Sequence, residues 1–151
     1  MKICFDMDGT IADLYSVENW LPMLRAADPT PYEKAAVMCN MSRLARTLNR
    51  LQKCGYEIGV ISWLAKNSSP EYDAAVTAAK KRWLAKHLAS VKFDFVEIVA
   101  YGTPKGNFST SCFDVLFDDE QKNREMWPGT AVDGVNFELL KDFIKNPIME
   151  G

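Results

Sequence analysis

A short apolar run near the N-terminus ends in two acids, and this junction limits the folds open to the chain. Ile3-Cys4-Phe5 has the pattern of a buried strand, and Asp6-Met7-Asp8-Gly9-Thr10 follows it directly. In an extended backbone the two aspartates lie on one side and Met7 on the other. Open α/β sheets bind ligands where their strands end, so the sequence predicts a ligand site on this carboxylate pair. The alternative is a turn that carries two solvated acids.

The rest of the chain alternates between strand-like and helix-like segments. Further strands are predicted at residues 56–61, 93–101, 113–117 and 129–132. Helices are predicted between them, with Ser42 as the N-cap and Gly55 as the stop of the first, and at about residues 71–88 and 137–144. Strands that are separated by helices pair in parallel with right-handed crossovers. The predicted fold class is α/β, a three-layer α/β/α sandwich with a mostly parallel, Rossmann-like sheet.

The chain of 151 residues has the length of one domain, and we expect residues 1–151 to form one. Residues 14–41 contain Trp20 and three prolines, so we expect one or two short helices and a loop there. This segment is the only insert that the sequence offers as a small cap over the strand ends.

Composition narrows the class of protein. Hydrophobic residues make up 48% and charged residues 25%, and the formal net charge of -2 argues against electrostatically driven nucleic-acid binding. Cys4, Cys39, Cys54 and Cys112 form no CxxC pair, so we expect reduced core thiols and no disulfide or zinc framework. No apolar run is long enough to span a membrane, and the strand-like N-terminus does not read as a signal peptide. We expect a cytoplasmic protein that does not associate with membranes.

Polar residues follow several of the predicted strands. Ser62 ends the second strand, Lys105 lies beyond the third, and Asp118-Asp119 end the fourth. In a parallel sheet these positions converge at one edge, beside the first acidic pair. Clustered acids favour Mg²⁺, and a lysine and a hydroxyl suit phosphate oxygens, so the set indicates phosphoryl transfer. Taken singly, each feature also has a structural interpretation, as an acidic turn, a surface lysine or a turn serine.

These residues occur in the order of the four motifs of the haloacid dehalogenase (HAD) superfamily, which the chain resembles over nearly its whole length. The resemblance implies that Asp6 is a nucleophile that becomes a transient aspartyl-phosphate. It implies that Asp8 protonates the leaving oxygen and then activates water. Thr10, Ser62 and Lys105 would bind the substrate.

The same resemblance implies a magnesium ion as cofactor. Its ligands would be the Asp6 carboxylate, the main-chain carbonyl of Asp8 and an acid of the Asp118-Asp119 pair. Asp118 is the first choice because it is nearer the strand end, and Asp119 is an alternative ligand or a neighbouring partner.

More narrowly, the chain resembles the 5'(3')-deoxyribonucleotidase branch of the superfamily, with a reduced cap. The likeness rests on the stretch from Asp6 to Asp13, on Lys81-Arg82-Trp83-Leu84 and on Phe117-Asp118-Asp119. Glu120 follows the acidic pair where a basic residue is frequent in that branch.

Four aromatic residues near the motifs are candidates to shape a substrate pocket, with core packing as the alternative: Tyr15, Trp20, Trp63 and Trp127. Trp63 is the strongest, because it follows Ser62 directly and an indole can stack on a base. The basic run Lys80-Lys81-Arg82 is interpreted as a solvated helix face, and His87 as structural.

The leading functional hypothesis is a magnesium-dependent phosphatase for a small phosphomonoester, with a nucleoside monophosphate as the favoured substrate. A small cap also allows a larger substrate, such as a polynucleotide 3'-phosphate end or a phosphoprotein, or a homo-oligomer whose partner covers the site. A non-catalytic HAD-like module that binds phosphorylated ligands or a protein partner is the alternative from another class.

Overall fold

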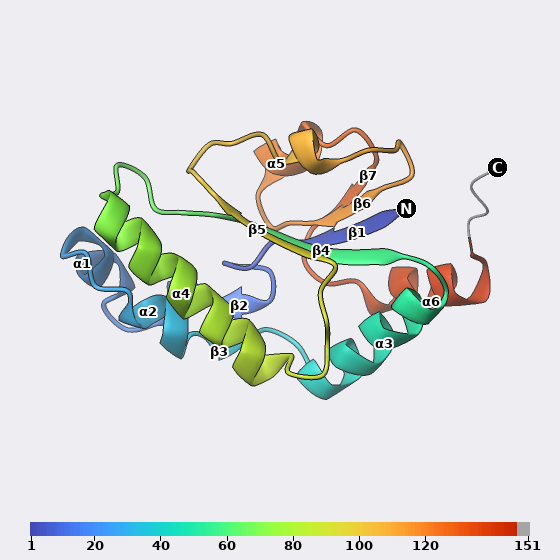
Figure 1. Cartoon of the computed structure of the whole chain (residues 1–151), viewed down its shortest axis with the longest axis horizontal. Coiled ribbons are helices and arrows are strands. Elements are labelled where there is room, and N and C mark those ends of the chain that lie inside the picture. The colour runs from blue at the N-terminus through green and yellow to red at the C-terminus, as the bar shows by residue number, and fades with distance from the viewer. Residues whose placement is uncertain (148–151) are drawn as a thin grey trace.

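The computed structural model describes residues 1–147 and places five strands in one sheet (Figure 1). These are β1 (Lys2–Phe5), β4 (Glu57–Trp63), β5 (Phe95–Val99), β6 (Val115–Phe117) and β7 (Thr130–Val132). Their order is β5-β4-β1-β6-β7, and all neighbouring pairs are parallel. The predicted three-layer, Rossmann-like α/β fold is confirmed. Because the winding reverses between β1 and β6, the ends of these two strands form the edge where such sheets bind ligands.

Helical layers cover both faces of the sheet (Figure 1). One layer contains α3 (Met41–Lys53), α4 (Pro70–His87) and α6 (Phe137–Lys145), and the thinner opposite layer contains the 3-10 helix η2 (Lys105–Phe108) and α5 (Gln121–Glu125). Among the described residues, no helix is long and apolar enough to cross a membrane.

Side-chain caps begin the three longer helices. The side-chain oxygens of Asn40, Ser69 and Asn136 each accept a backbone N–H of the first turn, at 2.9, 3.1 and 3.0 Å. The predicted N-cap of α3 at Ser42 is therefore wrong. Asn40 ends the preceding extended segment and offers an acceptor two residues earlier, so Ser42 lies inside the helix.

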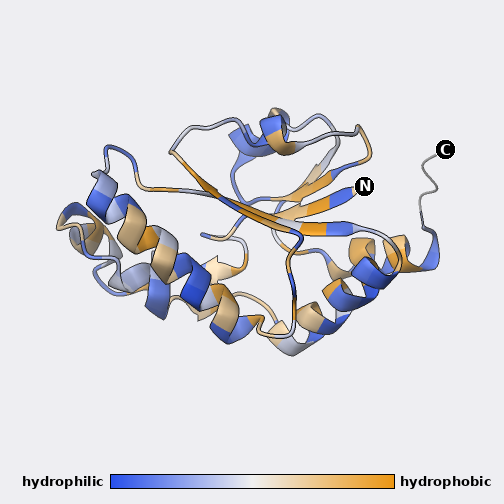
Figure 2. Cartoon of the chain, viewed as in Figure 1, coloured by the Kyte–Doolittle hydropathy of each residue, from blue (hydrophilic) through white to orange (hydrophobic). Residues whose placement is uncertain are grey.

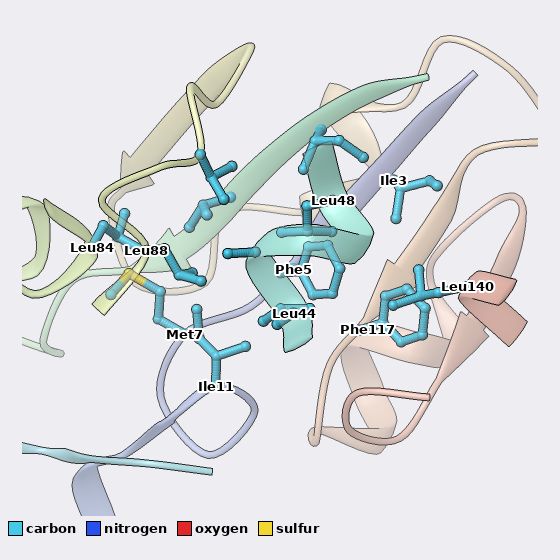
Figure 3. Packing of buried hydrophobic residues seen from close by; sticks show 14 of the residues in the cluster. Ile3, Phe5, Met7, Ile11, Leu44, Leu48, Leu84, Leu88, Phe117 and Leu140 are labelled. Atoms are coloured by element: carbon cyan, nitrogen blue, oxygen red, sulfur yellow. The ribbon is translucent and has the colours of Figure 1, made fainter. Parts of the chain in front are cut away.

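The larger hydrophobic core fills the space between the sheet and the three longer helices (Figure 3). Phe5 of β1 stacks on Phe117 of β6, with ring centroids 4.9 Å apart. Met7 is also buried here, so it points away from the two aspartates that flank it, as expected. Figure 2 shows mainly apolar residues along the central strands and a mixture of polar and apolar residues along the helices.

Residues 14–41 form more structure than one or two helices. They contain the 3-10 helix η1 (Leu14–Ser16), α1 (Trp20–Arg25), α2 (Thr30–Lys34) and β3 (Ala36–Val37), and β3 pairs antiparallel with β2 (Ala12–Asp13). Three contacts fix this segment to α4: Trp83 Nε1 to Ala35 O at 2.8 Å, Tyr72 Oη to Asp28 O at 3.1 Å, and Arg82 Nε to Glu33 Oε1 at 2.8 Å. Figure 1 shows the segment beside α4.

Two further expectations differ from the structure. Only Cys4 is a core thiol, because Cys54 and Cys112 lie on exposed ends of elements and Cys39 is half-buried. The strand predicted from residue 113 begins at Val115, and Phe113 stays exposed because Asp114 turns the chain by accepting the N–H groups of Thr110 and Ser111.

Candidate active site

The segment after β1 folds into a tight loop that presents both aspartates. The carbonyl of Met7 accepts the N–H groups of Thr10, Ile11 and Ala12, each at 3.0 Å. Gly9 has φ of 83°, and a Cβ at this position would collide with the carboxylate of Asp119. A glycine is therefore required both for the backbone conformation and for the close approach of this loop to Asp119.

Asp6 and Asp118 share one buried lysine. Lys105 Nζ lies 2.8 Å from Asp6 Oδ1 and 2.7 Å from Asp118 Oδ2. Asn123 of α5 also donates to Asp118 Oδ2, at 3.1 Å, and the N–H of Glu120 donates to Oδ1, at 2.9 Å. The ends of β1 and β6 and the start of η2 thus meet at one point, as the sequence predicted for Asp6, Lys105 and Asp118.

Thr10 connects the loop after β1 to the Asp118-Asp119 pair after β6. Its hydroxyl lies 3.2 Å from Asp6 Oδ2 and 3.3 Å from Asp119 Oδ1, and it accepts the N–H of Asp119 at 3.1 Å. Thr10 is buried and its hydroxyl faces these two acids. Its position ties together the carboxylates that would surround a cation.

The acids carry more negative charge than Lys105 offsets. Burial raises the pKa of Asp6 well above its usual range, against the effect of Lys105 and with the help of Asp118. Burial also raises the pKa of Asp119. The pKa of Lys105 is raised, because the carboxylates of Asp6 and Asp118 outweigh the burial that opposes its charge. Oxygens of Asp6, Asp118 and Asp119 lie within 4.8 Å of one another, so together they could hold a metal ion.

A second buried lysine serves Asp8. Lys80 Nζ lies 3.0 Å from Asp8 Oδ2, 2.6 Å from Ser62 Oγ and 2.7 Å from the carbonyl of Trp63. The interpretation of Lys80 as part of a solvated face is wrong, although Lys81 and Arg82 are exposed as expected. A signal was available: Val76, Lys80 and Leu84 are four residues apart, which places Lys80 on the apolar stripe of α4.

The two lysines reach the strand ends from opposite faces of the sheet. Lys80 comes from α4 in the layer of the larger core, and Lys105 comes from η2 in the thinner layer. Their side chains are only 1% and 2% exposed. Each of the two motif aspartates therefore has its own buried ammonium group.

An open cavity of about 390 Å³ lies over this edge of the sheet. Asp6, Asp8, Lys105 and Asp119 are among the residues that line it. The 14–41 segment contributes a largely apolar wall: Leu14, Tyr15, Trp20, Leu21, Leu24 and Tyr32. The rest of the lining includes Trp63, Leu64, Ala65, Lys66 and Tyr101. A phosphorylated molecule could thus place its phosphate beside the polar residues of the cavity and its apolar part against the apolar lining.

Two aromatic pairs line the cavity. Tyr15 and Trp20 pack edge to face with centroids 5.1 Å apart, and Trp63 and Tyr101 are 5.0 Å apart. Trp63 is held in place by its indole N–H, which donates to the carbonyl of Thr103 at 2.8 Å. The fourth candidate, Trp127, does not line this cavity: it is buried in the core of the thinner layer, with its N–H on the carbonyl of Asp114.

His87 lies outside the cavity lining and packs on Trp83, with ring centroids 4.5 Å apart. Sequence reasoning missed Tyr32, Tyr101 and Asn123 as site residues. Tyr32 lies on a segment without a strand-end signal, and Asn123 is on the short helix α5, which was not predicted. Tyr101 was predicted as the last residue of a strand, but β5 ends at Val99 and leaves Tyr101 in the loop that lines the cavity.

Comparison with known proteins identifies a shared fold. No protein-family model and no curated protein matches the chain. The chain is similar to a chain in the solved Pnkp1/Rnl/Hen1 complex, at 15% identity and a TM-score of 0.53, over 87% of this chain and 44% of the other. A D,D-heptose 1,7-bisphosphate phosphatase from Burkholderia thailandensis is 13% identical, with a TM-score of 0.48 over 82% of this chain and 69% of that chain. The similarity to the chain of the Pnkp1/Rnl/Hen1 complex shows a common fold. The present chain spans less than half the length of that chain.

Replacing Gly9 with alanine tests the close approach of the first and fourth motifs. We expect Gly9→Ala to lower stability by about 1–3 kcal/mol, because φ is positive and the new Cβ displaces Asp119. Urea unfolding measures this loss. Gly134→Ala is the matched control, since Gly134 also has positive φ but no atom lies within 4 Å of an added Cβ. Equal losses in the two variants would show that the contact with Asp119 contributes nothing.

Proposed function

We propose that this chain is a magnesium-dependent phosphatase of HAD type that hydrolyses phosphomonoesters through a phosphorylated Asp6. The observation that carries the proposal is the placement of Asp6 and Asp8 at the ligand-binding edge of the sheet, each beside its own buried lysine. A carboxylate nucleophile needs a neighbouring group that can exchange protons and cations that offset the charge of phosphate. The cavity lining contains both, since Asp8 can exchange protons and Lys105 is a cation.

In the proposed reaction, a carboxylate oxygen of Asp6 attacks the phosphorus, and the bond to the leaving oxygen breaks. Asp8 gives its proton to that oxygen. Asp8 then takes a proton from the water that attacks the aspartyl-phosphate, and inorganic phosphate leaves Asp6. The Asp8 side chain is 17% exposed, against 10% for Asp6, which suits the group that exchanges protons with product and water. Lys105 would hold a phosphoryl oxygen, whereas Ser62, which the sequence predicted for the same role, is fully buried and lies outside the cavity lining.

The residues present fit a magnesium ion. Asp6, Asp118 and the main-chain carbonyl of Asp8 would hold it, with Asp119 as the alternative carboxylate, and all of these donors are oxygens. Burial raises the pKa of Asp6 and of Asp119, so keeping both carboxylates ionised is costly without a further cation. When bound, the ion supplies positive charge that offsets the repulsion between the carboxylates and a phosphate.

The substrate class that we propose is the nucleoside monophosphates. Trp63, Tyr101, Tyr15 and Trp20 line the same cavity as Asp6 and Asp8 and offer aromatic surface on which a base could stack. The cavity volume of about 390 Å³ is that of a small-molecule site, which supports a small substrate over a polynucleotide end or a phosphoprotein. The 5' or 3' position of the phosphate is an outcome of the substrate screen below.

Removing the nucleophile tests the assigned reaction. Asp6→Asn is expected to abolish hydrolysis of p-nitrophenyl phosphate, because an amide cannot form the phosphorylated intermediate. Release of nitrophenol in the presence of magnesium measures the rate. Asp142→Asn on α6, an exposed acid outside the cavity lining, is the control and should keep the wild-type rate. Retained activity in Asp6→Asn would exclude the mechanism, and an inactive wild type would favour a phosphoryl-binding module.

Magnesium binding can be measured without turnover. Saturating the chelator-treated protein with Mg²⁺ should raise its Tm, since an ion at about 100 times its Kd stabilises the folded state by about 2.7 kcal/mol. Asp118→Asn should lose this increase, because it removes one of the three clustered carboxylates. Asp142→Asn again serves as the control. An equal increase in wild type and Asp118→Asn would place the ion elsewhere.

The aromatic wall is tested by a change in selectivity. Trp63→Leu should lower kcat/KM for deoxynucleoside monophosphates about tenfold and leave that for glycerol phosphate nearly unchanged, because stacking on a base contributes about 1–3 kcal/mol. Phe113→Leu, an exposed aromatic residue outside the cavity, is the control. The screen includes ribonucleotides, sugar phosphates and 3'-phosphorylated oligonucleotides. An equal fall for all substrates, or a preference for the oligonucleotides, would count against a base-binding wall.

A further inference from the structure

Lys80 places an ammonium group in the interior of the protein, directed at the strand ends. Its side chain is 1% exposed, although a lysine in the middle of a helix normally extends its charged end to water. The three protons of the ammonium group match three acceptors: Asp8 Oδ2, Ser62 Oγ and the carbonyl of Trp63. The ring of Tyr32 lies 5.2 Å away on the side of the 14–41 segment. The group is fully hydrogen-bonded and held on all sides.

This arrangement is costly as a device for stability alone. Burying two charges requires that both leave water, and a hydrophobic side chain of similar size often stabilises a protein as well or better. The stripe of α4 around Lys80 is apolar, with Val76 and Leu84 one turn before and after it. A methionine would continue that stripe. The contacts of Lys80 with two site residues therefore point to a role in the site.

The contact with Asp8 leaves one carboxylate oxygen for chemistry. Lys80 binds Oδ2 at 3.0 Å, so Oδ1 is the oxygen available to the leaving group and to water. As Asp8 transfers its proton, negative charge returns to the carboxylate. The ammonium group is already in place to stabilise that charge, which is an interaction that strengthens during the reaction.

The contact with Ser62 sets the direction of the hydroxyl proton. Lys80 can only donate, so Ser62 Oγ is the acceptor in the 2.6 Å contact. The single proton of the serine hydroxyl then points away from Lys80. Ser62 is fully buried and lies outside the cavity lining, so this contact helps to hold the ammonium group of Lys80 against Asp8.

We infer that Lys80 is a positioning residue, which orients Asp8 for proton transfer to the leaving oxygen. The inference rests on the proposed phosphatase function. In the step concerned, the Asp6–phosphorus bond forms, the bond to the leaving oxygen breaks, and the proton of Asp8 moves to that oxygen. Lys80 itself exchanges no proton and acts through Asp8, while Ser62 and the carbonyl of Trp63 hold its ammonium group in place. Lys105 serves Asp6 and Asp118 from the other face of the sheet.

The test compares two leaving groups. A nitrophenolate leaves without a proton, whereas an alkoxide requires one, so loss of an oriented acid affects glycerol phosphate more than p-nitrophenyl phosphate. We expect Lys80→Met to lower kcat/KM about 100-fold for the alkyl ester and less than about tenfold for the aryl ester. Lys80→Arg should recover part of the loss, and Lys81→Met, the exposed neighbour on α4, should behave as wild type. An equal fall for both esters, or a rise in KM alone, would overturn the inference.

Two further measurements separate this inference from folding and from the proposed function. In an Asp8→Asn background, Lys80→Met should lower kcat/KM less than about threefold. A residue that acts through Asp8 contributes little once the Asp8 carboxylate is gone. A crystal structure of Lys80→Met, whose Tm is measured first, should show Asp8 and Ser62 in new side-chain conformations. Unchanged conformations would overturn the inference even if the wild type proves inactive, whereas inactivity of the wild type on every ester overturns the function.

Discussion

The repulsion among four carboxylates at one edge of a sheet is the constraint on which the rest of this structure depends. Asp6, Asp8, Asp118 and Asp119 converge because parallel strands end together, and burial makes their charges costly. Two lysines, one from each helical layer, supply positive charge that offsets this repulsion. Both layers are therefore needed for the site: α4 must lie where Lys80 reaches Asp8, and η2 must lie where Lys105 reaches Asp6 and Asp118.

The sheet and the residues at its strand ends could be predicted from the sequence because both depend on local pattern. Apolar runs of strand length, separated by helical periodicity, give a parallel sheet, and the first polar residue after a strand lies at its edge. Asp6, Asp8, Ser62, Lys105 and Asp118 were found in this way, and the structure brings them together.

Features that depend on long-range packing could not be predicted in the same way. Lys80 looked like one member of a basic run, since three consecutive cations are typical of a solvated face, yet helical geometry turns the first of them inward. Its place on the apolar stripe was the available signal. Residues 14–41 contain prolines and show no clear helical or strand period. Their position as a wall of the cavity depends on contacts with α4, which the sequence does not reveal. Asn123 belongs to a helix of five residues, too short for a periodic signal.

The attachment of the 14–41 segment to α4 has a consequence for how the protein can change. The same helix carries Lys80 and anchors the aromatic wall through Trp83 and Tyr72, so a substitution that loosens the wall also disturbs the charges beneath it. Tyr101 and Lys66 also line the cavity, but they do not belong to α4 and their side chains are exposed. The wall formed by residues 14–41 is thus tied to the chemistry through α4, whereas the side chains of Tyr101 and Lys66 are freer to vary. Divergence to new substrates would begin at these two residues.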